Sequence, residues 1–224
     1  MDEKKEMLKV NEIFLGVQGE GLNIGMPQVF VRFHGCNLQC KWCDTYRSSL
    51  DYFECSVKIL VDRIMKVSNG IKAVCVTGGE PLVQSHRELA ELLYRLRNEG
   101  FYTQIFTNGT IYDSDVFDNC SMISMDMKPP SSGMKSEIGC LYNLNLRFEA
   151  GFPCEVKVVI QDLKDFRWML DNVYPIAKMP IILQPQYYAE KDYKLINFIK
   201  NEVLTIGLKN VRVLPQIHRI FGWK

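Results

Sequence analysis

Three cysteines form the most reactive cluster of the sequence: Cys36, Cys40 and Cys43. Thiolates are good ligands for zinc and for iron–sulfur clusters. A structural zinc site takes four ligands, so it needs a fourth from elsewhere, and His34 lies two residues before the first cysteine. A cubic [4Fe–4S] cluster held by only three thiolates keeps one iron open for another ligand. The spacing favours the cluster, because zinc ligands typically come as two separate pairs. The zinc alternative stays open.

Length and charge limit the possible functions. The chain has 224 residues, and we expect residues 1–224 to form a single domain with one core. The formal net charge is +1. Nucleic-acid-binding proteins usually carry a basic excess, so we expect no nucleic-acid partner. No apolar run approaches the roughly 20 residues that span a bilayer. The start of the chain is charged and lacks the apolar stretch of a signal peptide. We therefore expect a cytoplasmic protein without a membrane partner.

Short apolar segments alternate with amphipathic segments along most of the chain. Apolar runs predict strands, and apolar residues at helical spacing predict helices. The expected strands lie at residues 29–33, 72–77, 103–106, 122–125, 155–160, 181–183 and 211–214. The expected helices lie at residues 57–65, 86–99, 113–119, 163–177 and 191–204, with no assignment for residues 131–146. Such alternation predicts βαβ units and a parallel sheet.

About six or seven strands are too few for a closed eight-stranded barrel. The pattern fits a partial barrel or an open doubly wound sheet. We predict an α/β fold of the first kind, a partial TIM-like barrel with about six to seven mostly parallel strands. In both architectures ligands bind at the carboxyl ends of the strands. The motifs that follow the expected strands there are Gly35-Cys36, Gly78-Gly79-Glu80-Pro81, Asn108-Gly109, Asp126 with Lys128, and Gln184.

The tryptophan inside the cysteine cluster adds a family signal. Cys-x3-Cys-x-Trp-Cys, with Trp42 before the last cysteine, resembles the signature of radical S-adenosylmethionine (SAM) enzymes. Residues 78–81 resemble a second motif of that superfamily. The resemblance implies that the three cysteines hold a [4Fe–4S] cluster and that SAM binds its open iron. It further implies that Trp42 packs near the adenine, and that the SAM amino group lies near Gly78, Gly79 and Glu80.

Four further stretches resemble one family of these enzymes, the 7-carboxy-7-deazaguanine synthases. They are residues 12–21 with Gln18-Gly19-Glu20-Gly21, residues 43–45 with Cys-Asp-Thr, residues 124–133 with Pro-Ser-Ser-Gly at the end, and residues 214–219. The resemblance therefore runs nearly end to end. The chain departs from the family pattern at Gly16, Phe106 and Arg219, where Ser or Thr, Glu and Lys are common.

Membership of this family would assign roles to single residues. The SAM site would add Asn108, Ser124, Asp126, Lys128 and Gln184. Thr45 would bind Mg²⁺. The substrate-binding residues would be Val17, Gln18, Gly19, Glu20, Arg32, Thr77 and the C-terminal Lys224. Without the resemblance, residues 17–20 fit a glycine turn between two strands better than a binding site. Arg32 then fits a surface ion pair, and the polar residues at the strand ends fit helix caps or ion pairs.

The activity that the resemblance implies is a radical ring contraction. The pterin 6-carboxy-5,6,7,8-tetrahydropterin becomes 7-carboxy-7-deazaguanine with loss of ammonia, on the way to queuosine or archaeosine. The resemblance also implies a homodimer and an external one-electron reductant such as flavodoxin or ferredoxin. Two alternatives remain. An activase that makes a glycyl radical on a partner protein needs the cysteines but no pterin pocket, and a zinc-binding interaction domain needs no reaction at all.

Overall fold

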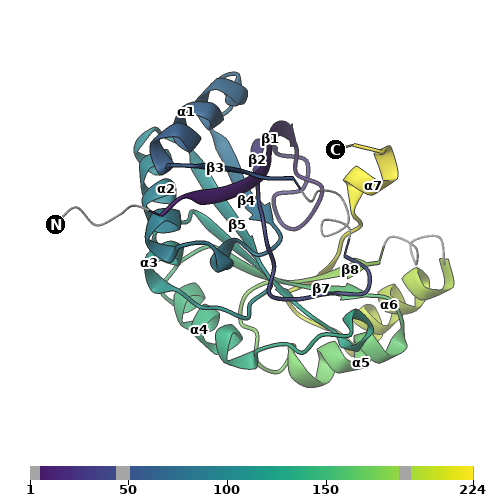
Figure 1. Cartoon of the computed structure of the whole chain (residues 1–224). Helices are drawn as coiled ribbons and strands as arrows, with labels where there is room; N and C mark the ends of the chain where they lie inside the picture. The colour runs from purple at the N-terminus through teal and green to yellow at the C-terminus, as the bar shows by residue number, and fades with distance from the viewer. Residues whose placement is uncertain (1–5, 44–50, 187–192, 224) are drawn as a thin grey trace.

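The computed structural model describes residues 6–43, 51–186 and 193–223. Within these ranges nine strands form one curved sheet in the order β3-β1-β2-β4-β5-β6-β7-β8-β9 (Figure 1). Most of the helices lie along the outer, convex side of this sheet, and α7 near the C-terminus lies close to the opposite, inner side (Figure 1). The inner side is therefore available for ligands.

The elements have the following bounds. The strands are β1 Leu8–Val17, β2 Pro27–Phe33, β3 Phe53–Cys55, β4 Ala73–Gly78, β5 Tyr102–Thr107, β6 Met122–Met127, β7 Cys154–Ile160, β8 Ile181–Pro185 and β9 Val211–Val213. The helices are α1 Val57–Ser68, α2 His86–Asn98, α3 Ser114–Asp118, α4 Ile138–Glu149, α5 Leu163–Asn172, α6 Tyr193–Ile206 and α7 Ile217–Phe221, with short 3-10 turns η1 Pro81–Val83 and η2 Pro130–Ser132.

The strand order confirms the predicted partial barrel. From β2 through β4 to β9 every neighbouring pair is parallel, which gives seven parallel strands. The sheet ends at β3 and β9, so it does not close within the described residues. The N-terminal edge was not predicted. There β1 pairs antiparallel with both β2 and β3.

Strand β2 shows how the sheet separates its two faces. Successive side chains point to opposite sides of a strand. Val29, Val31 and Phe33 are fully buried in the core beneath the helices. Phe30 and Arg32 alternate with them and line a cavity on the inner side. The same alternation recurs in the other central strands, so one face of the sheet carries the hydrophobic core and the other carries polar residues.

Two of the helices begin where an aspartate caps their first turn. Asp113 accepts a hydrogen bond from the Val116 amide at 2.9 Å, and Asp162 accepts from the amides of Lys164 and Asp165 at 2.9 and 3.0 Å. The helix predicted to reach residue 177 is shorter, because α5 ends at Asn172. Helix α4 occupies most of the region that had no predicted element.

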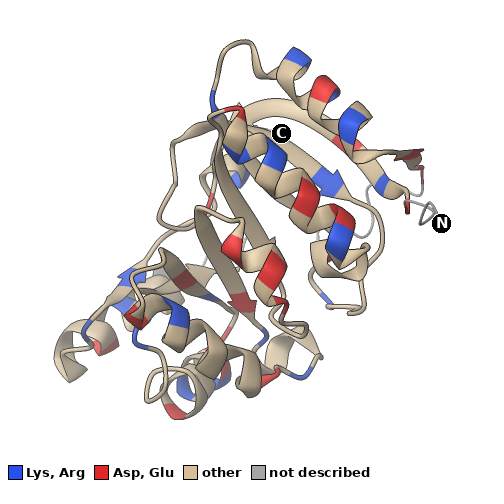
Figure 2. Cartoon of the chain, turned by 90° about the vertical axis from the view of Figure 1, so that its left-hand side faces the viewer, with Lys and Arg blue, Asp and Glu red and all other residues tan. Residues whose placement is uncertain are grey.

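Acidic and basic residues are interspersed in sequence along the outer helices (Figure 2). This pattern agrees with the formal net charge of +1. Among the described helices, none has the length and apolar character to cross a membrane.

The faces of α2 can be tested by stability. Leu92 is fully buried, whereas Tyr94 on the same helix is 57% exposed. We expect Leu92→Ala to lower the free energy of unfolding by about 2–5 kcal/mol, because it leaves a cavity in the core. We expect Tyr94→Ala, the matched control, to change it by less than about 0.5 kcal/mol. Chemical denaturation of the metal-free protein, followed by circular dichroism, measures both. Equal effects would contradict the assignment of the two faces.

Candidate active site

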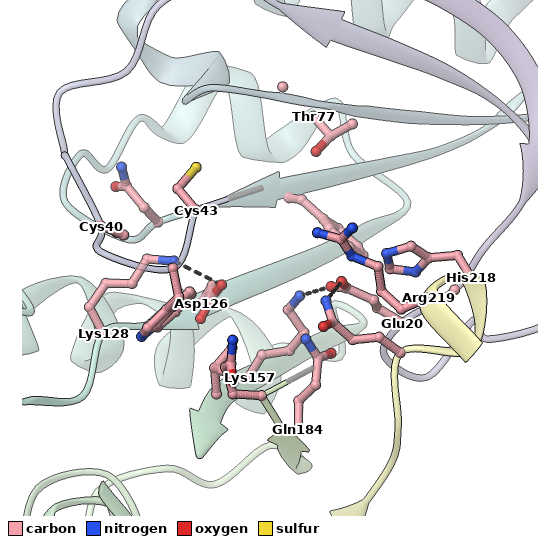
Figure 3. Close-up of a pocket in the computed structure, with 18 of the residues that line it drawn as sticks. Glu20, Cys40, Cys43, Thr77, Asp126, Lys128, Lys157, Gln184, His218 and Arg219 are labelled. Carbon is pink, nitrogen blue, oxygen red and sulfur yellow. Dashed lines mark hydrogen bonds and ion pairs between the residues drawn. The ribbon is translucent and has the colours of Figure 1, made fainter. Parts of the chain in front are cut away.

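One cavity of about 800 Å³ lies on the inner side of the sheet, at the carboxyl ends of the parallel strands (Figure 3). Its volume is in the range of small-molecule sites. Most of the predicted site residues line it together, although they come from distant parts of the chain. They are Val17, Gln18, Gly19, Glu20, Arg32, Cys36, Cys40, Trp42, Cys43, Thr77, Gly78, Gly79, Asn108, Asp126, Lys128 and Gln184.

The cavity has two ends. At one end, which we call the cysteine end, Cys40 and Cys43 lie near the pair of Lys128 and Asp126 (Figure 3). At the other, which we call the Glu20 end, Glu20 lies beside residues of the C-terminal segment (Figure 3). The predicted metal and SAM residues gather mainly at the first end, and the predicted substrate turn forms the second.

The loop that carries the three cysteines follows β2. None of the eight cysteines forms a disulfide, and Cys36, Cys40 and Cys43 all line the cavity, partly exposed. The Lys41 amide donates to the Ser132 carbonyl at 3.0 Å, which ties the loop to η2. Burial raises the pKa of the Cys36 and Cys40 thiols. A bound metal would therefore be needed to keep them as thiolates, as in an iron–sulfur site.

His34 does not complete a zinc site with these cysteines. Its ring stacks on Tyr52 with centroids 4.2 Å apart, and its Nδ1 lies 3.2 Å from Nδ2 of Asn11. His34 is not among the residues that line the cavity. In the described part of the chain, no three His, Cys, Asp or Glu side chains converge as ligands for one ion. Three thiols on a cavity wall instead suit a cluster in which each binds a different iron.

The turn after β4 passes very close to the cysteine loop. A Cβ atom on Gly79 would lie 1.9 Å from the carbonyl oxygen of Gly35, so a larger residue cannot be accommodated there without moving the backbone. The Gly79 amide donates to the Phe33 carbonyl at 3.0 Å, and the Glu80 amide donates to the Gly35 carbonyl at 2.8 Å. The glycine motif therefore joins the SAM side of the cavity to the metal loop.

Two residues predicted to bind SAM do not line the cavity. Glu80 is fully buried, and its carboxylate accepts from the amides of Leu82 and Asn108. Burial raises the pKa of Glu80, although these donors oppose the shift. Ser124 is also fully buried and donates to Glu155 at 2.6 Å. Glu80 therefore holds the turn that carries Asn108, and a direct contact of Glu80 or Ser124 with SAM stays a prediction.

The wall between the two ends offers unsatisfied acceptors. Asp126 pairs with Lys128 at 2.9 Å, and the Lys128 ammonium lies 5.2 Å from the centre of the Trp42 ring. Oδ1 of Asp126 and Oε1 of Gln184 are buried and have no hydrogen-bond partner. Buried acceptors normally have a donor, so these oxygens suit the hydroxyl and amino groups of a bound nucleoside such as SAM.

The Glu20 end is built on the turn between β1 and β2. The Glu20 carboxylate forms an ion pair with Lys157 of β7 and accepts a hydrogen bond from the Gln216 side chain. Burial alone would disfavour the charged form. The Lys157 ammonium, together with the smaller contributions of His218 and Gln216, outweighs burial and lowers the pKa of Glu20 to about 2. Glu20 is therefore a carboxylate at neutral pH.

Arg32 is engaged in the ion pair that the sequence allowed as an alternative. Its guanidinium bonds Glu12 and lies 5.1 Å from the centre of the Phe14 ring. Arg32 nevertheless lines the cavity, and Thr77 lies next to it on β4 as its register partner. A substrate carboxylate would compete with Glu12 for this guanidinium.

Four residues of the Glu20 end were not predicted as site residues: Lys157, Gln216, His218 and Arg219. The available signal for Lys157 is a charged residue inside an otherwise apolar strand, since lysine is rarely buried without a partner. Gln216 and His218 belong to the family-like C-terminal stretch, but nothing in the sequence assigned them a role. The predicted ligands Thr45 and Lys224 lie outside the described residues.

Comparison with known proteins agrees with this geometry. The sequence model of the radical SAM superfamily matches residues 30–122. The 7-carboxy-7-deazaguanine synthase of Thermoplasma acidophilum is 37% identical, over 94% of this chain and 95% of the relative. That of Methanospirillum hungatei is 41% identical, over 96% and 86%. The structure of QueE from Escherichia coli has the same fold, with a TM-score of 0.72, 23% identity and 94% of both chains covered. The chain therefore belongs to the 7-carboxy-7-deazaguanine synthases, a family of radical SAM enzymes.

Proposed function

We propose that this chain catalyses the ring contraction of 6-carboxy-5,6,7,8-tetrahydropterin to 7-carboxy-7-deazaguanine, with loss of ammonia, in deazapurine biosynthesis. The observation that carries the proposal is the meeting of both predicted ligand sets in one cavity. A cysteine end alone would serve an activase equally well. The Glu20 end, with a charged carboxylate and a turn whose residues line the cavity, gives a place for a small polar substrate beside SAM.

The cysteine end suits the cofactors of the radical SAM enzymes. Cys36, Cys40 and Cys43 would hold a [4Fe–4S] cluster with one iron open for SAM. The residues that would hold SAM are Trp42, Gly78, Gly79, Asn108, Asp126, Lys128 and Gln184. When bound, the cluster and SAM supply one-electron chemistry that removes a hydrogen atom from the substrate. The task of the protein is to fix the relative positions of the ligands and to exclude water.

The Glu20 end suits a pterin that carries a carboxylate. The Glu20 carboxylate would accept hydrogen bonds from the substrate amino group, a charge-assisted contact. Backbone groups of Val17, Gln18 and Gly19 would form hydrogen bonds with the edge of the pterin ring. Arg32 would bind the substrate carboxylate in exchange for Glu12, with Thr77 beside it.

Several finer parts of the proposal rest on the family resemblance. They are Mg²⁺ bound by Thr45, a substrate contact from Lys224, a homodimer, and an external one-electron reductant such as flavodoxin or ferredoxin. A cytoplasmic location is supported by the eight cysteines without a disulfide, since such thiols are typical of reducing compartments.

The cluster assignment is tested by removing one thiol. We expect Cys40→Ala to lose the [4Fe–4S] cluster, because two thiolates leave two irons without protein ligands. Anaerobic reconstitution with iron and sulfide, followed by visible absorbance and metal analysis, measures this loss. Cys140→Ala is the matched control, since Cys140 is 9% exposed and outside the cavity, and should keep the cluster.

A second variant separates the cluster from zinc. We expect His34→Ala to reconstitute like the wild type, because His34 faces Tyr52 and Asn11. A colourless wild-type protein with one zinc per chain, or a His34→Ala variant that has lost its metal, would reject the iron–sulfur assignment.

The reaction is tested with the reconstituted enzyme, SAM, Mg²⁺, dithionite and 6-carboxy-5,6,7,8-tetrahydropterin. We expect 7-carboxy-7-deazaguanine by mass spectrometry, and none with Cys40→Ala. Wild-type enzyme that cleaves SAM without forming this product would reject the proposed substrate and favour an activase. Removal of Mg²⁺ with a chelator should slow product formation, and an unchanged rate would remove the role given to Thr45.

A further inference from the structure

Lys157 is a buried cation that the proposed chemistry leaves without a role. Its side chain is 4% exposed, in the middle of β7. It pairs with Glu20, and its ammonium lies 4.7 Å from the centre of the Phe106 ring. Asp126 is its register partner on β6. An isolated lysine at such a site would lose its proton, but the two carboxylates raise the pKa of Lys157 despite its burial.

The Glu20 carboxylate is oriented by two separate donors. Lys157 bonds Oε2, and the Gln216 amide bonds Oε1. A carboxylate has about four lone-pair sites, so each oxygen keeps one for a further donor. Glu20 also lines the cavity with a side chain that is 15% exposed. The remaining lone pairs are therefore available to a ligand in the cavity.

The turn that carries Glu20 is packed between two parts of the chain. A Cβ atom on Gly19 would lie 2.1 Å from Nδ1 of His218, so the C-terminal segment covers one side. A Cβ atom on Gly21, where φ is +69°, would lie 2.1 Å from Oε1 of Glu155. Glu155 also accepts from the Leu22 amide at 2.6 Å. Strand β7 therefore supports the turn twice, through Glu155 and through Lys157.

We propose that Lys157 is a positioning residue for substrate recognition, which holds the Glu20 carboxylate charged and oriented toward the N–H donors of the pterin edge. The proposal rests on the proposed function, because it takes Glu20 as the group that faces the substrate. Lys157 acts through Glu20 and does not contact the substrate itself. Its ammonium is engaged by Glu20 and covered on another side by Phe106.

Loss of Lys157 would change the acid dependence of binding. The charged or titratable groups around the Glu20–Lys157 pair are Glu155 of β7, Asp126 of β6, Lys128 directly after β6, Cys75 of β4, Arg32 of β2, and His218 and Arg219 of α7. Without the Lys157 cation, burial would raise the pKa of Glu20 instead of being outweighed. As the pH falls through that raised pKa, Glu20 takes up a proton, loses the charge that strengthens its hydrogen bonds to the substrate, and turns one acceptor oxygen into a donor.

The test compares reconstituted holoenzymes in the product assay. We expect Lys157→Met to raise KM for the carboxypterin roughly 30-fold or more, the scale on which truncating one partner of a buried charge pair weakens binding. We expect kcat to stay within about threefold, since the lost interaction serves binding. KM of the variant should rise further from about pH 8 to pH 6, while KM of the wild type stays flat over that range. Lys178→Met, which removes an exposed ion pair with Glu149, is the control and should match the wild type.

A double-mutant cycle shows whether Lys157 acts through Glu20. In the Glu20→Gln background, Lys157→Met should change KM by less than about threefold, because its partner charge is already gone. The double variant lacks both buried charges, so it avoids the unpaired Glu20 carboxylate that could prevent Lys157→Met from folding. If Lys157→Met does not fold, the comparison of the double variant with Glu20→Gln still measures the effect of Lys157→Met on KM. Acid dependence that survives in Glu20→Gln does not come from Glu20.

Three outcomes would overturn the proposal. The first is an equal rise of KM for Lys157→Met in both backgrounds. The second is a KM of Lys157→Met that equals the wild-type value. The third is a fall of kcat at unchanged KM. Cluster absorbance should be the same in Lys157→Met and Lys178→Met as in the wild type, so that a change in KM is not a loss of the cluster. If the wild-type enzyme makes no product, the proposed function itself is rejected. That result differs from the three outcomes above, each of which requires an active wild type.

Discussion

The need to pair buried charges is the constraint on which the rest of the site depends. A charge taken out of water is tolerated only where a counter-ion or several hydrogen-bond donors replace the water. On the inner side of the sheet, four of the charged groups form a row of alternating sign: Glu20, Lys157, Asp126 and Lys128. Lys157 and Asp126 are register partners on neighbouring strands, so the two ion pairs meet there. The row is neutral as a whole and connects the Glu20 end to the cysteine end. Each ligand that enters the cavity therefore finds both a cation and an anion within the same wall.

The architecture explains why these charges can occupy the inner face at all. A doubly wound sheet has helices on both faces and needs apolar residues on both. Here most of the helices lie along the outer side (Figure 1), so the residues that alternate with the core remain available for polar roles. Because the strands are parallel, their carboxyl ends lie at one edge. Asp126, Lys157 and Gln184 come from the consecutive strands β6, β7 and β8 and line the same cavity without any local sequence motif that joins them.

Features that depend on residues close together in the sequence were predicted, whereas features that depend on contacts between distant residues were missed. The parallel strands were predictable, because their apolar runs and the helices between them are local patterns. The edge strands β1 and β3 were not, since β1 is implied only by a glycine turn between two strands at residues 17–20, and β3 has three residues. Motifs identified Glu80 and Ser124 but not the direction in which they point, because that depends on partners such as Glu155 from another strand. Lys157 lies 137 residues from Glu20 in the sequence, and no spacing rule connects them.

The glycines of the turn between β1 and β2 suit a loop that recognises a ligand through its backbone. A loop that presents amides and carbonyls to a ligand selects among ligands only if its backbone cannot shift to fit others. The ring of His218 packs directly on Gly19, and the carboxylate of Glu155 packs on Gly21. A side chain at either glycine would separate the turn from its supports. The Ile217 amide also donates to the Gly19 carbonyl at 3.1 Å, so the last part of the chain holds the same turn as β7. The turn is therefore supported from both sides and carries the charge of Glu20. These two features suit it to select a flat heterocycle by shape and by hydrogen bonding.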